Sequence, residues 1–423
     1  MIKKLHQCLL FLVVFSIIIQ TGKHFWPQFS LVDGIRVDYL SPTLYFSDTL
    51  IVAFILTSLI VYKQKFLKVL KKINLAQLLF FLLILSSTLL AYNLHAAIFG
   101  VIKMAEFVLF AVCIAMTFQK KNIKALTLAL LLSSIIVSFI AVLQIVLNHS
   151  LNGAFYFLGE RSFISSTIGV AKFSLNDQTI VRPYATFAHP NVLAFFIFFA
   201  GIILSFNARF ENGLRKALIY LSSSISFMVL IFTFSRVITL SAFIYIFYLF
   251  SLLKAKKITY LLLFVITLTL FLIFEGRYAD FSSIYKETKE RQGLSTISVN
   301  LIKESPIFGV GVNNFFVHEI KYQKEVTPVF LQPVHNIYLY LFSQIGLVAG
   351  VLVMVFIFKT LKQVRASFLT SKSKSSKAFY TSIFIVLIAA LCTGLFDHFL
   401  LTLQQAQIML ALTLGLCWNR NLI

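Results

Sequence analysis

The sequence is poor in charged residues, and above all in acids. Only 12% of its 423 residues are charged, and 15 acids stand against 37 bases. It contains no Asp-x-Asp pair, so a divalent metal clamp on a diphosphate has no obvious ligands. All four cysteines fall inside apolar runs, which argues against a disulfide framework and against a cysteine metal site. We therefore expect neither a bound metal nor a cofactor.

Apolar residues are abundant, at 59% of the chain, a value typical of membrane proteins. A membrane-spanning helix needs about 20 mostly apolar residues. Runs that reach or approach this length lie at 7–22, 46–62, 75–92, 98–118, 124–147, 191–207, 217–234, 236–253, 258–275, 336–358, 378–396 and 399–417. They predict an all-α, polytopic helix bundle of about 12 transmembrane helices, which forms one integral membrane domain over residues 1–423. The first run lacks a small-x-small cleavage site, so we expect it to remain as a span.

The positive charge lies in alternate loops between these runs. Bases are concentrated at both termini and at 63–72, 120–124, 209–216, 254–257 and 359–377. These stretches hold 23 of the 37 bases and a single acid, so they account for the whole net charge of +22. Lys and Arg near span ends favour the cytoplasmic side. The charge therefore orients the chain, with both termini cytoplasmic, and does not indicate nucleic acid as a partner.

Two segments on the opposite, external face are too long to be simple turns: 148–190 and 276–335. The second, between predicted spans 9 and 10, contains an amphipathic stretch at about 284–304, which suits a helix lying on the outer surface. Ser305-Pro306 should end that helix, because the residue before proline avoids helical geometry. Long loops in compact proteins are often functional. We expect these two loops to form the active-site face.

Four short external motifs carry the residues suited to chemistry. They are Arg182 with His189-Pro190-Asn191, Ser235-Arg236, Arg291, and His335-Asn336. Taken singly, an arginine at a span end most often anchors the span at the headgroups, and a histidine at a helix start is most often just a polar residue. Taken together, arginines bind phosphate oxygens bidentately, and histidine accepts a proton near neutral pH. The set therefore indicates a site for a polyanion beside a proton acceptor.

Other polar features have simpler interpretations. Gly309-Val310-Gly311 lacks a preceding strand and a third glycine, so it is no dinucleotide motif and we expect a tight turn. Lys103 and Glu106, one turn apart within a span, are expected to form an ion pair.

Over about residues 170 to 415 the chain resembles the O-antigen ligase and polymerase superfamily of bacterial membrane glycan transferases. The motifs that carry the resemblance are Arg182 with His189-Pro190-Asn191, Ser235-Arg236, Arg291 ahead of Pro306-Ile307-Phe308-Gly309-Val310-Gly311, and His335-Asn336 followed by Gly346. Each motif is short, and it is their order, spacing and external placement that make the combination specific.

The resemblance implies a donor glycan linked through diphosphate to undecaprenol, used on the periplasmic or extracellular face of the bacterial plasma membrane. By the same resemblance, Arg236 and Arg291 hold the diphosphate, Arg182 adds another phosphate contact, and His335 is the base for the acceptor hydroxyl. Asp397 matches an acidic residue near the site, and Asn336 and His189 are possible accessory residues. Direct displacement by the activated hydroxyl would invert the anomeric carbon.

Several alternatives stay open on the sequence alone. A ligase moves the glycan to a final acceptor, which is a glycolipid, another glycan or a protein, whereas a polymerase moves it onto another lipid-linked repeat. The long loop before His335 favours a ligase-like enzyme slightly. A transporter of lipid-linked glycan should carry its charges near the membrane midplane, whereas here they cluster at the outer boundary. A non-catalytic scaffold would have no need of arginines beside a histidine.

Overall fold

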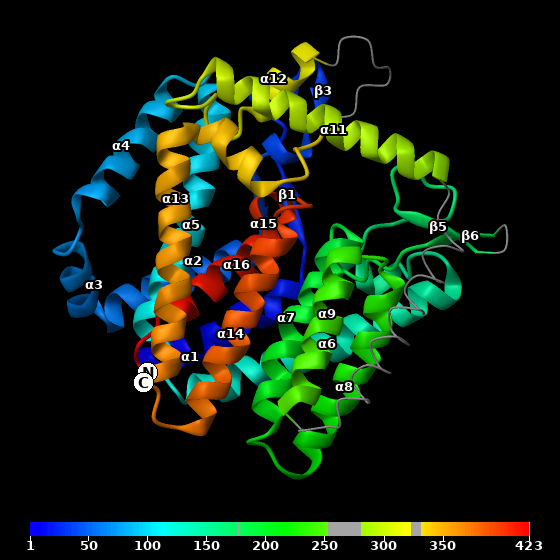
Figure 1. Cartoon of the computed structure of the whole chain (residues 1–423). Coiled ribbons are helices and arrows are strands. Elements are labelled where there is room, and N and C mark those ends of the chain that lie inside the picture. The colour runs from blue at the N-terminus through cyan, green and yellow to red at the C-terminus, as the bar shows by residue number, and fades with distance from the viewer. Residues whose placement is uncertain (176–177, 253–280, 323–330, 423) are drawn as a thin grey trace. The chain divides into compact units, whose positions relative to one another are not determined.

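The structure, a computed structural model, describes residues 1–175, 178–252, 281–322 and 331–422, and these are mostly helical (Figure 1). The chain divides into two compact units. Unit 1 comprises Met1–Leu130 with Arg291–Ile423, and unit 2 comprises Leu131–Glu290. The prediction of one membrane domain stays a prediction.

Most of the helices belong to unit 1. They are α1 (Ile2–Phe15), α2 (Phe46–Val61), α3 (Lys63–Leu70), α4 (Leu75–Leu89), α5 (Leu94–Thr117), α12 (Phe315–Glu319), α13 (Ile337–Thr370), α14 (Lys374–Thr393), α15 (Phe399–Thr402) and α16 (Gln404–Trp418). Both termini lie at the end of this unit opposite α12 (Figure 1). Two small antiparallel sheets stand between α1 and α2, formed by β1 (Gly22–His24) with β4 (Thr43–Tyr45) and by β2 (Leu31–Val32) with β3 (Ile35–Arg36).

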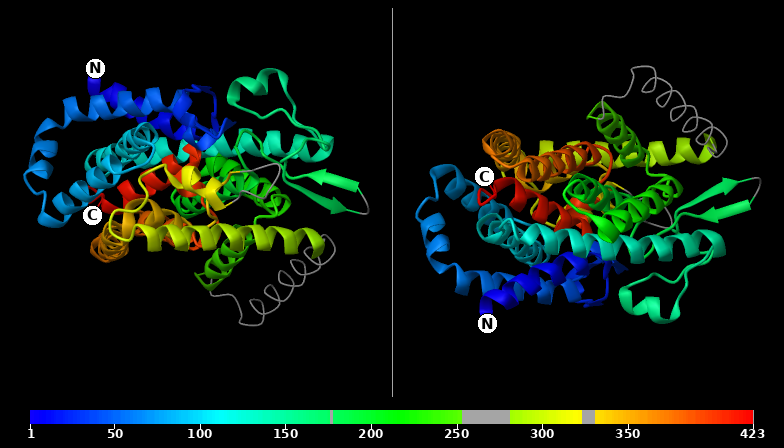
Figure 2. Two further views of the ribbon diagram at one scale, coloured as in Figure 1. Left: turned by 90° about the horizontal axis from the view of Figure 1, so that it is seen from above. Right: turned by 90° about the horizontal axis from the view of Figure 1, so that it is seen from below.

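Unit 2 contains α7 (Pro190–Ala208), α8 (Gly213–Phe232) and α9 (Arg236–Leu252), with α7 packed against both others. An antiparallel hairpin of β5 (Lys172–Leu175) and β6 (Gln178–Val181) projects from these helices (Figure 2). Two helices, α6 (Asn122–Leu147) and α11 (Phe281–Glu304), begin in one unit and end in the other.

Helices cover every predicted span except 258–275, which lies outside the described residues. Among the described helices, six are long and apolar enough to cross a membrane: α5, α6, α7, α8, α13 and α14. A seventh would be the pair α2 and α3, which meet at a bend of 90°. The last predicted span is broken into α15 and α16. A polytopic helical protein is therefore confirmed, and the number of twelve spans stays a prediction.

Local sequence explains where several helices begin. Asn74 accepts a hydrogen bond from the backbone of Gln77, whose side chain accepts one from the backbone of Asn74 in return, so α4 starts with a capping box. Asn93 caps α5 by a single side-chain bond, since its Oδ1 accepts the backbone N–H of Ala96 at 3.0 Å. Pro190 occupies the first turn of α7, where its missing N–H costs no hydrogen bond.

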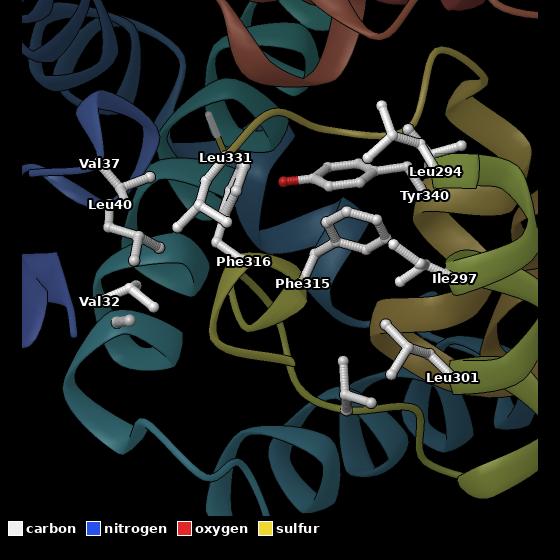
Figure 3. Close-up of a cluster of buried hydrophobic side chains, with 13 residues drawn as sticks. Val32, Val37, Leu40, Leu294, Ile297, Leu301, Phe315, Phe316, Leu331 and Tyr340 are labelled. Atoms are coloured by element: carbon white, nitrogen blue, oxygen red, sulfur yellow. The ribbon is translucent and has the colours of Figure 1, made fainter. Parts of the chain in front are cut away.

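The predicted amphipathic helix is present as α11, which ends at Glu304 immediately before Ser305-Pro306, as expected. Its apolar side packs against protein. The buried side chains of this cluster, most of them labelled in Figure 3, include Leu294, Ile297 and Leu301 of α11, Phe315 and Phe316 of α12, Tyr340 of α13, and Leu331 and Val334. The hydroxyl of Ser298 also donates to the Leu339 carbonyl oxygen at 2.9 Å. Burial in the core of unit 1 thus accounts for the apolar face, and the placement on the outer surface stays a prediction.

The Gly309-Val310-Gly311 segment lies between two turns, at 306–308 and 312–313, and it packs against a break in α13. Gly346 interrupts α13 with φ of 77°, and Gly309 has φ of 68°, a region that favours glycine. The Val310 N–H donates to the Ser343 carbonyl oxygen at 2.9 Å. The backbones approach so closely that a Cβ on Gly346 would lie 2.1 Å from the carbonyl oxygen of Ile307. These backbone contacts hold the segment that follows α11 against α13.

Candidate active site

The start of α13 positions His335. Asn336 is the N-cap of this helix, and its Oδ1 accepts hydrogen bonds from the backbone N–H groups of Tyr338 and Leu339 at 2.9 and 3.0 Å. His335 directly precedes the cap and is partly exposed. The cap therefore fixes the backbone next to His335. This places the imidazole at the N-terminus of α13, which is the positive end of the helix dipole.

The segment 394–398, between α14 and α15, is held against this helix start. The Asn336 Nδ2 donates to the Leu395 carbonyl oxygen at 3.1 Å. From α11, the Arg291 Nη1 donates to the Phe396 carbonyl oxygen, also at 3.1 Å. One segment thus carries contacts from both the predicted base region and a predicted phosphate-binding arginine.

A second histidine, His398, lies directly beside His335. Their ring centroids are 5.1 Å apart in an edge-to-face arrangement. His398 is buried, and the preceding carboxylate of Asp397 accepts its backbone N–H at 2.7 Å. Burial lowers the pKa of His398 to about 4; Asp397 opposes this shift, and the charges of His335 and Arg291 add to it. The family resemblance implies a place near the site for Asp397 but assigns no role to His398, because nothing in the local sequence places His398 beside residue 335.

In unit 2, Arg182 connects the start of α7 to the turn between α8 and α9. Its Nε donates to the Thr233 carbonyl oxygen at 2.6 Å, and its Nη2 donates to the Asn191 Oδ1 at 2.8 Å. Arg236 is the first residue of α9 and is exposed. Arg182 thereby steadies the turn that presents Arg236, and its own predicted phosphate contact stays a prediction.

His189 is the N-cap of α7. Its Nδ1 accepts the backbone N–H of Asn191 at 3.1 Å, which requires the unprotonated nitrogen at that position. Its ring also lies edge-to-face with Tyr184, with centroids 6.2 Å apart. In this geometry His189 organises the helix start, and an accessory role in the chemistry stays a prediction.

The structure therefore brings the predicted site residues together in two groups. Unit 1 holds Arg291, His335, Asn336 and Asp397, and unit 2 holds Arg182, His189 and Arg236. That the two groups form one site stays a prediction. Within the described residues, no group of three or more His, Cys, Asp or Glu side chains is arranged to hold a metal ion.

The fold defines the class of protein as a helical membrane protein with several spans. Residues 221–354 match the family described as O-antigen ligase. The match supports the O-antigen ligase superfamily for this chain and confirms the resemblance found in the sequence. The matched range includes Arg236, Arg291 and His335. The search of curated proteins found no match.

Proposed function

We propose that the chain transfers a glycan from an undecaprenyl-diphosphate-linked donor to a hydroxyl acceptor on the outer face of the bacterial plasma membrane. The observation that carries the proposal is the shared contact of the Arg291 and His335 regions with segment 394–398, inside a family that includes ligases. A permanent cation and a partly exposed imidazole are the two groups this reaction needs.

The chemistry follows from those two groups. His335 takes the proton of the acceptor hydroxyl while its oxygen attacks the anomeric carbon. The bond from that carbon to the diphosphate breaks, and undecaprenyl diphosphate leaves with the bonding electrons. Negative charge grows on the diphosphate during this step, and Arg291, with Arg236 and Arg182, stabilises it. One displacement inverts the anomeric carbon, and it requires neither a metal nor another cofactor.

The membrane placement supports a lipid-carried donor. Nucleotide sugars do not normally reach the outer face, whereas a lipid-linked glycan is delivered within the bilayer itself. The partners are then the lipid-linked donor, the hydroxyl acceptor and the surrounding membrane lipids. We place both termini in the cytoplasm and the site on the periplasmic or extracellular side, following the charge of the loops.

Substitution of the charged residues tests the proposal. In purified full-length protein supplied with lipid-linked glycan and acceptor, Arg291→Lys or Arg236→Lys should lower kcat/KM about tenfold or more, because an ammonium cannot bind two oxygens in a fork. His335→Ala should lower kcat roughly 100-fold or more.

Matched controls in unit 1 are Arg36→Lys and His95→Ala, which change exposed residues outside the site and should leave the rate unchanged. Wild-type rates in both arginine variants would remove the diphosphate role, and a fully active His335→Ala across neutral pH would remove the base.

The products distinguish a ligase from a polymerase. A ligase should move the glycan once, to a glycolipid, glycan or protein acceptor, whereas a polymerase should give lipid-linked products of increasing length from the donor alone. The reaction should proceed with a metal chelator present. The ligase-like assignment would be abandoned if the donor alone yielded a ladder of longer products.

A further inference from the structure

The buried His398 is the one imidazole within the described part of unit 1 that faces the predicted base. It cannot meet an acceptor itself, because it lies beneath the surface with 8% of its area exposed. Its ring stands at 86° to that of His335, with 5.1 Å between centroids. Any effect of His398 on transfer must therefore act through His335.

We propose that His398 is a positioning residue that fixes the imidazole of His335, and that Thr402 in turn fixes His398. This inference rests on the proposed function, since it assumes that His335 is the base. It assigns a role to a residue that contacts neither the donor nor the acceptor.

Apart from His335, two side chains hold the ring of His398. Its Nδ1 lies 2.7 Å from the Thr402 Oγ1, one helical turn further along α15. The Thr402 hydroxyl also lies 3.2 Å from the backbone carbonyl oxygen of His398, so the threonine rotamer is itself restrained. On another side the ring of Tyr39 meets His398 edge-to-face at 5.8 Å, and Tyr39 is stacked on Phe316. Because the ring of His398 is held in place, it packs against His335 as a rigid neighbour. This contact restricts the side-chain rotation of His335.

The charge state of His398 suits this role. Because its pKa is lowered to about 4, the ring is neutral at the pH where His335 is expected to accept a proton. The charged and titratable groups that face it are Asp397, His335 and Arg291, with Tyr39 on its edge. A neutral neighbour lets His335 become positively charged without like-charge repulsion from the second imidazole.

Two variants separate the ring contact from the hydrogen bond. His398→Asn offers an amide to Thr402 in place of Nδ1 but removes the ring beside His335. Thr402→Val keeps the ring and removes the hydroxyl that orients it. In purified full-length protein, kcat should fall roughly tenfold in His398→Asn and several-fold in Thr402→Val, with the donor KM unchanged in both.

Thr402→Ser is the matched control, because it retains the hydroxyl and should restore kcat to that of the wild type. A fall in kcat at constant KM, restored by serine, supports positioning rather than a loss of fold. Wild-type kcat in both His398→Asn and Thr402→Val, with His335→Ala inactive, would overturn the positioning role and leave the proposed function standing. Full activity in His335→Ala would overturn both.

Discussion

At the scale of single residues, the most informative charged group outside the candidate site is a partly buried triad in unit 1. Lys103 of α5 donates to the Asp48 Oδ1 at 2.9 Å and to the Glu106 Oε2 at 2.7 Å. Asp48 also accepts the backbone N–H of Tyr45 at 2.9 Å and a hydrogen bond from Gln404. Asp48 therefore joins α2, α5 and α16 and also accepts a backbone N–H, whereas Glu106 pairs with Lys103 of its own helix and interacts otherwise with Asp48.

This difference predicts unequal costs for neutralising the two acids. Asp48→Asn removes the charge and one oxygen of a carboxylate whose two oxygens together face three donors. It should destabilise unit 1 by about 3 kcal/mol, since breaking a largely buried ion pair leaves charge uncompensated. Glu106→Gln keeps an oxygen for Lys103 and should cost about 1 kcal/mol. Thermal unfolding in detergent measures both. A melting temperature lowered more by Glu106→Gln than by Asp48→Asn would contradict the argument.

The sequence predicted part of this triad and part of the site. Lys103 and Glu106 are one turn apart, so their ion pair followed from helical geometry and is confirmed. Asp48 lies 55 residues away from Lys103, and no local pattern connects them. His398 escaped notice for the same reason, because its contact with His335 depends on how segment 394–398 folds back on α13.

At the scale of elements, the break in α13 is the feature on which the candidate base depends. Gly346→Ala should destabilise the protein by about 2 kcal/mol or more, because alanine is strained at a φ of 77° and its Cβ would overlap the Ile307 carbonyl oxygen. The melting temperature and the transfer rate should both fall, since the start of α13 carries His335.

Gly293→Ala is the matched control for this prediction. Gly293 lies in α11, and nothing is within 4 Å of the position its Cβ would take. Alanine there should leave stability unchanged or raise it slightly, by up to about 1 kcal/mol. An unchanged melting temperature in Gly346→Ala would show that α13 does not need this break.

The sequence predicted some of the helices and strands and missed others. Long apolar runs predicted α5, α6, α7 and α8 well, because apolar composition sustained over some 20 residues leaves few alternatives. The short strands at 22–45 were not predicted, since two or three residues carry no periodic signal. The amphipathic pattern predicted α11 but not its packing partner, because protein core and membrane surface favour the same side chains.

At the scale of the whole molecule, loop charge and helix length indicate different numbers of membrane spans. Positive loops predict twelve spans with both termini inside, whereas six described helices meet the length and composition expected of a span. Short apolar helices such as α4 and α9 account for part of the difference. The predicted span 258–275 matters most, because it decides on which side of the membrane α11 lies.

Cysteine labelling tests this span directly. Asn212, at the start of α8, is predicted to be cytoplasmic, and Thr296, on the exposed side of α11, is predicted to be external. In the predicted topology α8 and α9 supply two crossings between them, so the two positions lie on opposite sides only if 258–275 supplies a third. In a background without the native cysteines, a membrane-impermeant maleimide added outside intact cells should label Thr296→Cys and leave Asn212→Cys unlabelled.

Lys372→Cys, in the basic connection between α13 and α14, is the internal control and should react only after the membrane is opened. Thr296→Cys protected together with Asn212→Cys would put α11 and the adjoining base on the cytoplasmic side. A lipid-linked donor on the outer leaflet would then never reach His335. The labelling pattern thus tests the topology and the outer-face chemistry in one measurement, independently of any activity assay.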